Sequence, residues 1–206
     1  MKFFYQTHSP YARQVLVLAL ETGLAERLEV AHHETSPTVR NEAVFAVNPL
    51  GKVPVLVLDD GLALFDSAVI CDYLDVLHGG NRLVPPSGRE RVLALRLQAV
   101  AHGITDAGSW VRQETVRRPA PYRFPAMRDG QTQKLIAAYD FLEREPALDG
   151  PIHIGQIALA CALSWIEFRH LPGFRDGRPR LAAWYDRFCR RPSMLATPMS
   201  DQGILD

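Results

Sequence analysis

The pattern of apolar and polar residues changes character near residue 80. Before this point, short apolar runs of strand length alternate with segments whose apolar residues recur at helical spacing. After it, segments of helical spacing follow one another with no strand pattern between them. Strands that alternate with helices are typical of an α/β domain, and consecutive helical patterns are typical of a bundle. The chain is therefore predicted to hold an α/β domain followed by an all-α helical bundle domain.

The first region predicts elements in the order β-α-β-α-β-β-α. Strands are expected at residues 2–6, 28–32, 53–58 and 62–65, and helices at residues 10–22, 36–47 and 67–77. Ser9 is a good N-cap residue ahead of Pro10, and Gly23 marks the end of the first helix. Pro54 stands second in the third strand, where its missing N–H has to face away from the ladder. Residues 59–61 predict a hairpin turn between the last two strands.

The second region predicts helices behind a linker at residues 81–86. A long helix is expected to follow a capping box at residues 87–90, with apolar positions from Val92 to Val111, and further helices are expected at residues 131–145, 154–168 and 179–191. Ser87 and Glu90 match a capping box at the start of the longest helix. Residues 154–168 are mostly apolar on every side, so we expect this segment to be the buried central helix of the domain.

The composition predicts a folded, soluble protein and argues against two classes of partner. Apolar residues make up 47% and charged residues 22% of the 206 residues, which excludes a disordered chain. The formal net charge is zero, which argues against nucleic-acid binding and against a basic membrane-surface protein. No apolar run reaches about 18 residues and no signal peptide is recognisable, so we expect no membrane segment and a cytoplasmic location. The net charge of zero hides an asymmetry between the two regions. Residues 1–80 hold 5 basic and 10 acidic residues, whereas residues 81–206 hold 18 basic and 13 acidic residues.

Cysteine and histidine positions argue against redox and metal chemistry. The cysteines Cys71, Cys161 and Cys189 are far apart and form no CxxC motif, so buried free thiols are expected and a dithiol oxidoreductase is unfavoured. His32 and His33 are adjacent on a predicted strand and so point to opposite faces. A shared metal ion there is therefore unfavoured, and we expect no metal.

Three motifs in the first region carry a resemblance to a known family. They are Ser-Pro-Tyr-Ala-Arg at residues 9–13, Asn-Pro-Leu-Gly-Lys-Val-Pro-Val-Leu at residues 48–56, and Asp-Ser-Ala-Val-Ile-Cys-Asp-Tyr-Leu at residues 66–74. In this order, ahead of an all-helical half, they resemble a cytosolic glutathione S-transferase with a thioredoxin-like first domain. The resemblance covers roughly residues 1–195 and points to a bacterial, serine-type branch.

The resemblance implies the bounds of the domains, and the sequence departs from the family pattern at one place. It implies a thioredoxin-like glutathione-binding domain at residues 1–80, a linker at 81–86 and a helical domain at 87–206. In the family the central helix usually opens with a Ser/Thr-x-x-Asp box, whereas His153 and Gln156 occupy those places here. Glutamine can still play the reciprocal part of the box, but histidine is a poorer cap.

The resemblance places Ser9 at the thiol-activating position of the family. A hydroxyl donor at a helix N-terminus can stabilise the glutathione thiolate in two ways, through a hydrogen bond and through the helix dipole. A role as N-cap only is the alternative, and the two roles are compatible. Related omega-type enzymes carry a cysteine at this place and form mixed disulfides, so the serine here predicts simple thiolate addition instead.

The remaining glutathione contacts are implied by the other two motifs. Val53 would pair its backbone with the peptide part of glutathione, and Pro54 would follow a cis bond. Asp66 would hold the γ-glutamyl amine, and Ser67 the γ-glutamyl carboxylate at a helix N-terminus. The alternatives are an ordinary strand-start proline and a plain helix cap. Lys52 would reach the glycyl carboxylate or remain a solvated lysine.

The acceptor site is expected in a cleft between the two domains. Candidate side chains for the acceptor site are Tyr11, His102, Asp106, Trp110 and Tyr122. The alternative for each of them is an ordinary core or surface residue that contacts no ligand. The leading hypothesis is a detoxifying transferase that adds glutathione to a small, largely apolar electrophile. The alternative is a protein of the same fold that binds glutathione or a small ligand with little turnover. A homodimer is expected by resemblance.

Overall fold

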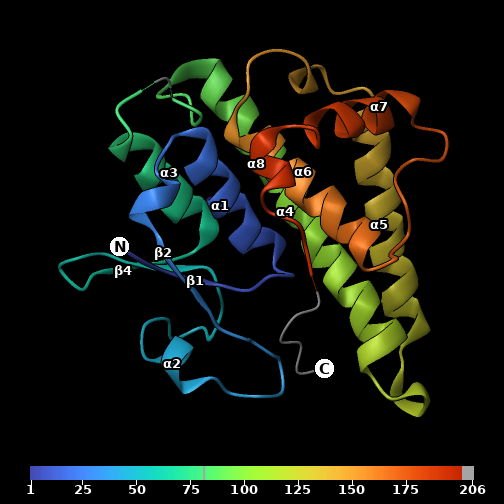
Figure 1. The fold of residues 1–206 in the computed structure, drawn as a ribbon. Helices are drawn as coiled ribbons and strands as arrows, with labels where there is room; N and C mark the ends of the chain where they lie inside the picture. Colours follow the sequence, from blue (N-terminus) through green and yellow to red (C-terminus); the bar gives the residue numbers. More distant parts are fainter. Residues whose placement is uncertain (81, 201–206) are drawn as a thin grey trace. The chain divides into compact units, whose positions relative to one another are not determined.

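The computed structural model describes residues 1–80 and 82–200, in two compact units (Figure 1). The first unit comprises Met1–Pro86 and the segment that begins at Pro192, and the second comprises Ser87–Arg191. The sequence assigned all residues from 87 onward to the helical domain. The difference arises because the segment after Pro192 packs against the first helix of the chain.

The first unit is built on a mixed sheet of four strands in the order β2-β1-β3-β4. The strands are β1 Lys2–Tyr5, β2 Glu29–His32, β3 Val55–Val57 and β4 Ala63–Leu64, and the helices are α1 Pro10–Glu21, α2 Glu42–Phe45 and α3 Ser67–Leu77. Strand β1 is parallel to β2 and antiparallel to β3, and β3 is antiparallel to β4. The predicted α/β class and element order, with a thioredoxin-like arrangement, are confirmed.

Both faces of this sheet are covered. Helices α1 and α3 pack against each other on one face (Figure 1). On the other face, Phe4 and Val55 form a buried cluster with Val44 of α2. Neighbouring strand residues point to opposite faces, so Phe3 and Leu56 are buried toward α1 and α3. The alternation explains why consecutive aromatic residues in β1 are both buried.

Two elements of the first unit begin clearly later than predicted. Strand β3 begins at Val55 rather than at residue 53, because Pro54 has no N–H to donate to the ladder. Helix α2 begins at Glu42 rather than at residue 36. Its start is fixed by Asn41, whose Oδ1 accepts hydrogen bonds from the Ala43 and Val44 N–H groups.

The second unit is a bundle of helices around a buried central helix. The long helices are α4 Gly88–Arg112, α5 Pro125–Glu143, α6 Ile154–Phe168 and α7 Pro179–Phe188. Helix α6 is buried on nearly every side, as predicted. It packs closely on α4, since a Cβ at Gly155 would lie 2.5 Å from the Ala94 carbonyl oxygen. Among the described residues, no helix is long and apolar enough to cross a membrane.

Short elements complete the described chain. They are the 3-10 turns Ala25–Arg27, Ala120–Tyr122 and Pro146–Leu148, the π-helical turn Gln113–Arg117, and the one-turn helix α8 Pro192–Leu195. Helix α5 begins at Pro125 rather than at residue 131, because the Glu114 carboxylate accepts hydrogen bonds from Arg118 and from the Phe124 N–H and so closes the preceding turn. The predicted capping box at Ser87 is not formed, because Ser87 makes no side-chain cap hydrogen bond.

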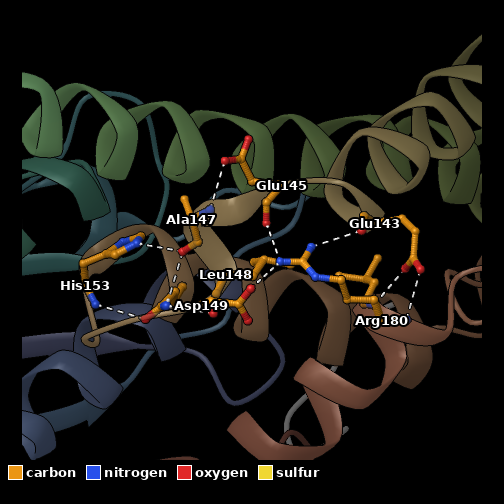
Figure 2. Close-up of polar contacts among 9 residues, drawn as sticks. Glu143, Glu145, Ala147, Leu148, Asp149, His153 and Arg180 are labelled. Atoms are coloured by element: carbon orange, nitrogen blue, oxygen red, sulfur yellow. Dashed lines mark hydrogen bonds and ion pairs between the residues drawn. The ribbon is translucent and has the colours of Figure 1, made fainter.

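The start of α6 is capped despite its unusual cap residue. His153 Nδ1 accepts a hydrogen bond from the Gly155 N–H at 3.2 Å, and the His153 N–H donates to Gln156 Oε1 at 3.2 Å (Figure 2). With Nδ1 accepting, the ring proton lies on Nε2, which donates to the Ala147 carbonyl at 3.1 Å. The expectation that histidine would cap poorly is therefore not met, because a neutral imidazole supplies both an acceptor and a donor here.

A single arginine joins three segments beside this cap. Arg180 donates to the carbonyl oxygens of Glu143 and Glu145 at 3.0 and 2.9 Å and pairs with Asp149 at 2.7 Å (Figure 2). The Glu143 carboxylate in turn accepts from the N–H groups of Arg180 and Leu181 at the start of α7. These contacts satisfy backbone groups at the end of α5 and at the start of α7.

Candidate active site

Three segments of the first unit meet at one edge of its sheet. Because β3 is antiparallel to both β1 and β4, the end of β1, the start of β3 and the end of β4 share that edge. The chain leaves β1 toward Ser9, enters β3 from Val53 and leaves β4 toward Asp66 and Ser67. The topology therefore gathers residues from all three predicted motifs.

Ser9 caps helix α1 and is 8% exposed. Its Oγ accepts a hydrogen bond from the Ala12 N–H at 3.2 Å, and its own N–H donates to the Gln6 carbonyl oxygen at 3.0 Å. Among the described residues, the Ser9 hydroxyl donates to no acceptor. Capping uses an oxygen lone pair, so the hydroxyl proton remains available to a ligand.

Ser67 opens helix α3, where its neighbour supplies the cap. The Asp66 Oδ1 atom accepts from the Ala68 N–H at 3.0 Å. Ser67 is 1% exposed, and within the part of the chain that the structure describes its Oγ has no hydrogen-bond partner. A buried hydroxyl without a partner is energetically unfavourable. A free hydroxyl at a helix N-terminus suits an anionic ligand group.

Val53 presents backbone groups that the sheet does not use. Leu56 pairs with Leu64 in the ladder, and continuing that register toward the start of β3 brings Val53 opposite Ser67. Among the described residues, the Val53 N–H and carbonyl oxygen form no hydrogen bond. The bond from Val53 to Pro54 is cis, as predicted. An extended ligand could therefore pair with Val53 as an added strand.

The loop before Val53 is held by side-chain contacts. Asn48, which is buried, donates from Nδ2 to the Lys52 carbonyl at 2.8 Å and accepts from the Leu50 N–H at 3.0 Å. Gly51 has φ +62°, and a Cβ there would lie 2.3 Å from the Phe45 ring. Any larger residue at that position would displace the loop. Lys52 is exposed, and its role toward a carboxylate stays a prediction.

Comparisons with known proteins agree on the family. The models of the glutathione S-transferase N-terminal and C-terminal domains match residues 8–77 and 109–187. An uncharacterized GST-like protein of Escherichia coli, YibF, is 31% identical over 203 residues, which are 96% of this chain and 98% of YibF. The chain belongs to the glutathione S-transferase family.

Solved structures of related transferases support the same assignment. A glutathione transferase family member from Pseudomonas fluorescens Pf-5, with bound glutathione, is 41% identical and has a TM-score of 0.93. The match covers 97% of this chain and 98% of that one. The Pf-5 family member with bound S-(propanoic acid)-glutathione is 42% identical, with a TM-score of 0.88 over 97% and 100% of the chains.

The predicted acceptor residues of this family member lie in both units. Tyr11 belongs to helix α1 of the first unit and is partly exposed. His102, Asp106 and Trp110 lie on α4 at four-residue spacing, so they share one stripe of that helix. Tyr122, in a 3-10 turn, and Trp110 are exposed by 74% and 48%. Their role toward an acceptor stays a prediction.

The adjacent histidines have separate surroundings. His32 Nε2 lies 2.6 Å from a Glu34 carboxylate oxygen, whereas the His33 ring stacks on Phe4 with centroids 4.2 Å apart. Burial and the nearby Lys2 ammonium lower the pKa of His33. Cys71 and Cys161 are buried free thiols, as predicted, and Cys189 is a partly exposed free thiol.

The sequence reasoning missed two buried residues beside Ser9. Gln6, at the end of β1, donates to Glu34 Oε2 at 2.6 Å and accepts from the Thr35 hydroxyl at 3.0 Å, and so fixes the loop after β2. Arg13, one turn after Ser9, is 5% exposed. Arg13 belongs to the first motif. The signal that could have revealed its burial is its position as a charged residue among the apolar positions of the predicted helix. Gln6 gave no such signal.

Proposed function

We propose that this transferase activates the thiol of glutathione with Ser9 and adds it to a small, largely apolar electrophile. The observation that carries the proposal is the gathering of Ser9, Val53 and the unpartnered Ser67 hydroxyl at one sheet edge. This proposal assigns the chain to the serine-type branch of the family and the glutathione site to residues 1–80.

The chemical demand on Ser9 is stabilisation of an anion. A free thiol has a pKa of about 8.5, and lowering it by about two units corresponds to about 2.7 kcal/mol of thiolate stabilisation. The Ser9 hydroxyl donates a hydrogen bond to the thiolate, and the N-terminus of α1 adds a favourable dipole. The thiol proton is released to solvent, and the thiolate sulfur forms a bond to the electrophilic carbon. In a substitution the leaving group departs with the electron pair of the broken bond, and in an addition the π electron pair moves to the neighbouring atom, which then takes a proton from water.

The rest of glutathione is held by local donors. The Ser67 hydroxyl and the N-terminus of α3 bind the γ-glutamyl carboxylate, and the Asp66 carboxylate binds the amine. The Val53 N–H and carbonyl oxygen pair with the cysteinyl residue as an added strand. Lys52 faces the glycyl carboxylate. Because residues 1–80 carry a net charge of −5, such local donors rather than the net field must hold an anionic ligand.

The proposal defines the electrophile only by its chemical class, which is a small, largely apolar molecule that forms a thioether with glutathione. The Pf-5 transferase was solved with a glutathione thioether bound, which supports thioether formation as the reaction. Tyr11, His102, Asp106, Trp110 and Tyr122 are the side chains that we assign to the acceptor. Aromatic groups among them favour a largely apolar acceptor.

The proposal is tested by turnover and binding measured together. Wild type is expected to bind glutathione in calorimetry and to conjugate a chromogenic aryl halide or another electrophile. Binding without turnover on several electrophile classes would favour the alternative, a glutathione-binding protein of the same fold. Absence of glutathione binding would refute both.

We also propose a cytoplasmic homodimer that serves in detoxification. Val69 and Val76 lie seven residues apart on one face of α3 and are exposed by 49% and 58%, and Val92 of α4 is exposed by 64%. Exposed apolar side chains at such positions favour an interface between subunits. Free cysteines favour a reducing compartment. Sedimentation at micromolar concentration tests the dimer.

A further inference from the structure

Residues 192–200 run along helix α1 in the direction opposite to it. Ser193 Oγ donates to the Glu21 carboxylate at 2.5 Å, at the end of α1. Thr197 and Met194 are bonded to Arg13 in the first turn of the helix, and Ser200 is bonded to Thr7 in the loop before it. Helix α8, at the start of this segment, packs on α1 (Figure 1). We call residues 192–200 the return segment.

Arg13 is the buried centre of this contact. Its Nε donates to Thr197 Oγ1 at 3.2 Å and its Nη2 to the Met194 carbonyl oxygen at 3.0 Å. Thr197 is itself buried, and its hydroxyl donates to the Ser193 carbonyl oxygen at 2.9 Å. In the described part of the chain, Arg13 forms no ion pair with a carboxylate. A guanidinium held in this way depends on the return segment for its hydrogen bonds.

The far end of the return segment reaches the loop that carries Ser9. Thr7 donates from its hydroxyl to the Ser200 carbonyl oxygen at 3.0 Å, and the Ser200 N–H donates to the Thr7 carbonyl oxygen at 3.4 Å. Thr7 is two residues before Ser9, and Arg13 is four residues after it. The return segment is therefore bonded to the chain on both sides of Ser9.

We propose that the return segment fixes the orientation of Ser9 and that Arg13 is the positioning residue that holds it there. The proposal rests on the role of Ser9 in the proposed function. A hydroxyl donates well only within a narrow range of distance and angle, so a loop that shifts would weaken its bond to the thiolate. Arg13 holds the return segment in place, and the return segment in turn holds the chain on either side of Ser9.

Hydrogen exchange in the ligand-free, full-length chain tests whether Arg13 and the return segment hold the residues around Ser9. Arg13→Met keeps the length of the side chain and removes its donors. We expect amides of residues 7–12 and of the return segment to exchange faster together, by about tenfold, as loss of a hydrogen bond to a charged group implies. Arg27→Met, which replaces an exposed arginine of the same unit, is the matched control and should change neither. Faster exchange in the return segment alone would overturn the proposal.

Thiolate titration tests the consequence for chemistry. The ultraviolet absorbance of bound glutathione is followed against pH in wild type, Arg13→Met and Thr197→Val. Both variants are expected to raise the thiol pKa by about half a unit, which lowers the ratio of thiolate to thiol at a given pH by about threefold. Because Thr197→Val keeps the Arg13 charge, an effect confined to Arg13→Met would indicate direct electrostatics and overturn positioning. A titration unchanged in both variants would overturn it as well.

The two readouts separate this inference from the proposed function. If wild type binds glutathione without lowering its thiol pKa, the proposed role of Ser9 fails. Coupled exchange of residues 7–12 and the return segment would then still decide whether Arg13 positions Ser9. Arg13→Lys gives a further check, since a lysine keeps the charge but cannot bond both acceptors in the same geometry. Positioning predicts that lysine restores less than half of the lost thiolate signal.

Discussion

Helices α1 and α3 both begin at the sheet edge of the candidate site, yet their serines are used differently. Ser9 is the cap of α1, so its oxygen already accepts a hydrogen bond from the Ala12 N–H. At α3 the cap is Asp66, and the hydroxyl of Ser67 is buried with no partner among the described residues. One hydroxyl is fixed before a ligand arrives, and the other is left unsatisfied.

This difference separates two tasks that a glutathione site requires. A hydroxyl that activates a thiol has to point in one direction, and capping achieves that while leaving the proton free. A hydroxyl that binds a carboxylate gains its hydrogen bond only in the complex, which favours ligand binding. We therefore expect changes at Ser9 to affect chemistry more than affinity for the tripeptide, and changes at Ser67 to affect affinity alone.

The largest expected effect is that of Ser9→Ala on turnover. If the serine lowers the thiol pKa from about 8.5 to about 6.5, its loss reduces the thiolate fraction at pH 6.5 by about 50-fold. We expect kcat/KM for an aryl halide to fall by about that factor, and the deficit to shrink as the assay pH rises. Ser9→Thr, which keeps a hydroxyl, is the control. Full activity of the alanine variant at low pH would contradict a role for this hydroxyl.

Ser67→Ala is expected to weaken glutathione binding by about tenfold or more, since a hydrogen bond to a charged group contributes about 1.5–3 kcal/mol. The free protein should not lose stability, because this hydroxyl has no partner in it. Asp66→Ala sharpens the contrast, since loss of the cap should lower the free energy of unfolding by about 1 kcal/mol. Calorimetry and chemical denaturation measure both quantities. A Ser67→Ala variant that is destabilised but binds normally would reverse the assignment.

Helix α6 offers a third kind of start, with a cap that titrates. Burial lowers the pKa of His153 below its ordinary value of 6.5, against the opposing effect of its hydrogen bond to the Ala147 carbonyl. Below that pH the unfolded chain takes up a proton that the folded protein resists, so the free energy of unfolding should fall as pH drops.

Chemical denaturation between pH 7.5 and 5.5 measures the slope of the free energy of unfolding against pH. His153→Ser should reduce it, since serine caps without titrating. At pH 7.5, His153→Ala should cost about 1 kcal/mol, the usual value of a lost cap. The same slope in wild type and His153→Ser would show that other groups cause it.

The smallest expected effect comes from the solvated lysine of the site. Lys52 is exposed, so the attraction that we propose between it and the glycyl carboxylate would be screened by water and salt. Lys52→Met should raise the Kd for glutathione by less than about fivefold, and the difference should disappear in high salt. A larger loss that persists in salt would mean that Lys52 makes a buried contact.

Much of the first unit could be predicted because its signals are local. Ser9, Pro10 and Gly23 mark the ends of α1 through their own backbone preferences, the element order follows from the apolar pattern, and the thioredoxin-like arrangement of the sheet is implied by the family resemblance. The early end of the ladder at Val55 and the late start of α2 depend on which backbone groups find partners, and spacing alone does not show this.

The parts that sequence reasoning missed depend on contacts between distant segments. Arg13 is bonded to residues of the return segment, which the sequence assigned to the other domain. Gln6 is bonded across the sheet to the loop after β2. The free state of the Ser67 hydroxyl is also a property of the folded chain, since the motif alone would fit a plain helix cap equally well.

Calorimetry with glutathione and with S-methylglutathione, which lacks the thiol, tests the division between Ser9 and Ser67 most directly. At about pH 7.5, Ser9→Ala should weaken glutathione binding by about tenfold, the value of a bound thiol pKa of about 6.5, and change S-methylglutathione binding by less than about twofold. Ser67→Ala should weaken both ligands by one common factor. Equal weakening of both ligands by Ser9→Ala, or unchanged binding of both by Ser67→Ala, would contradict the account.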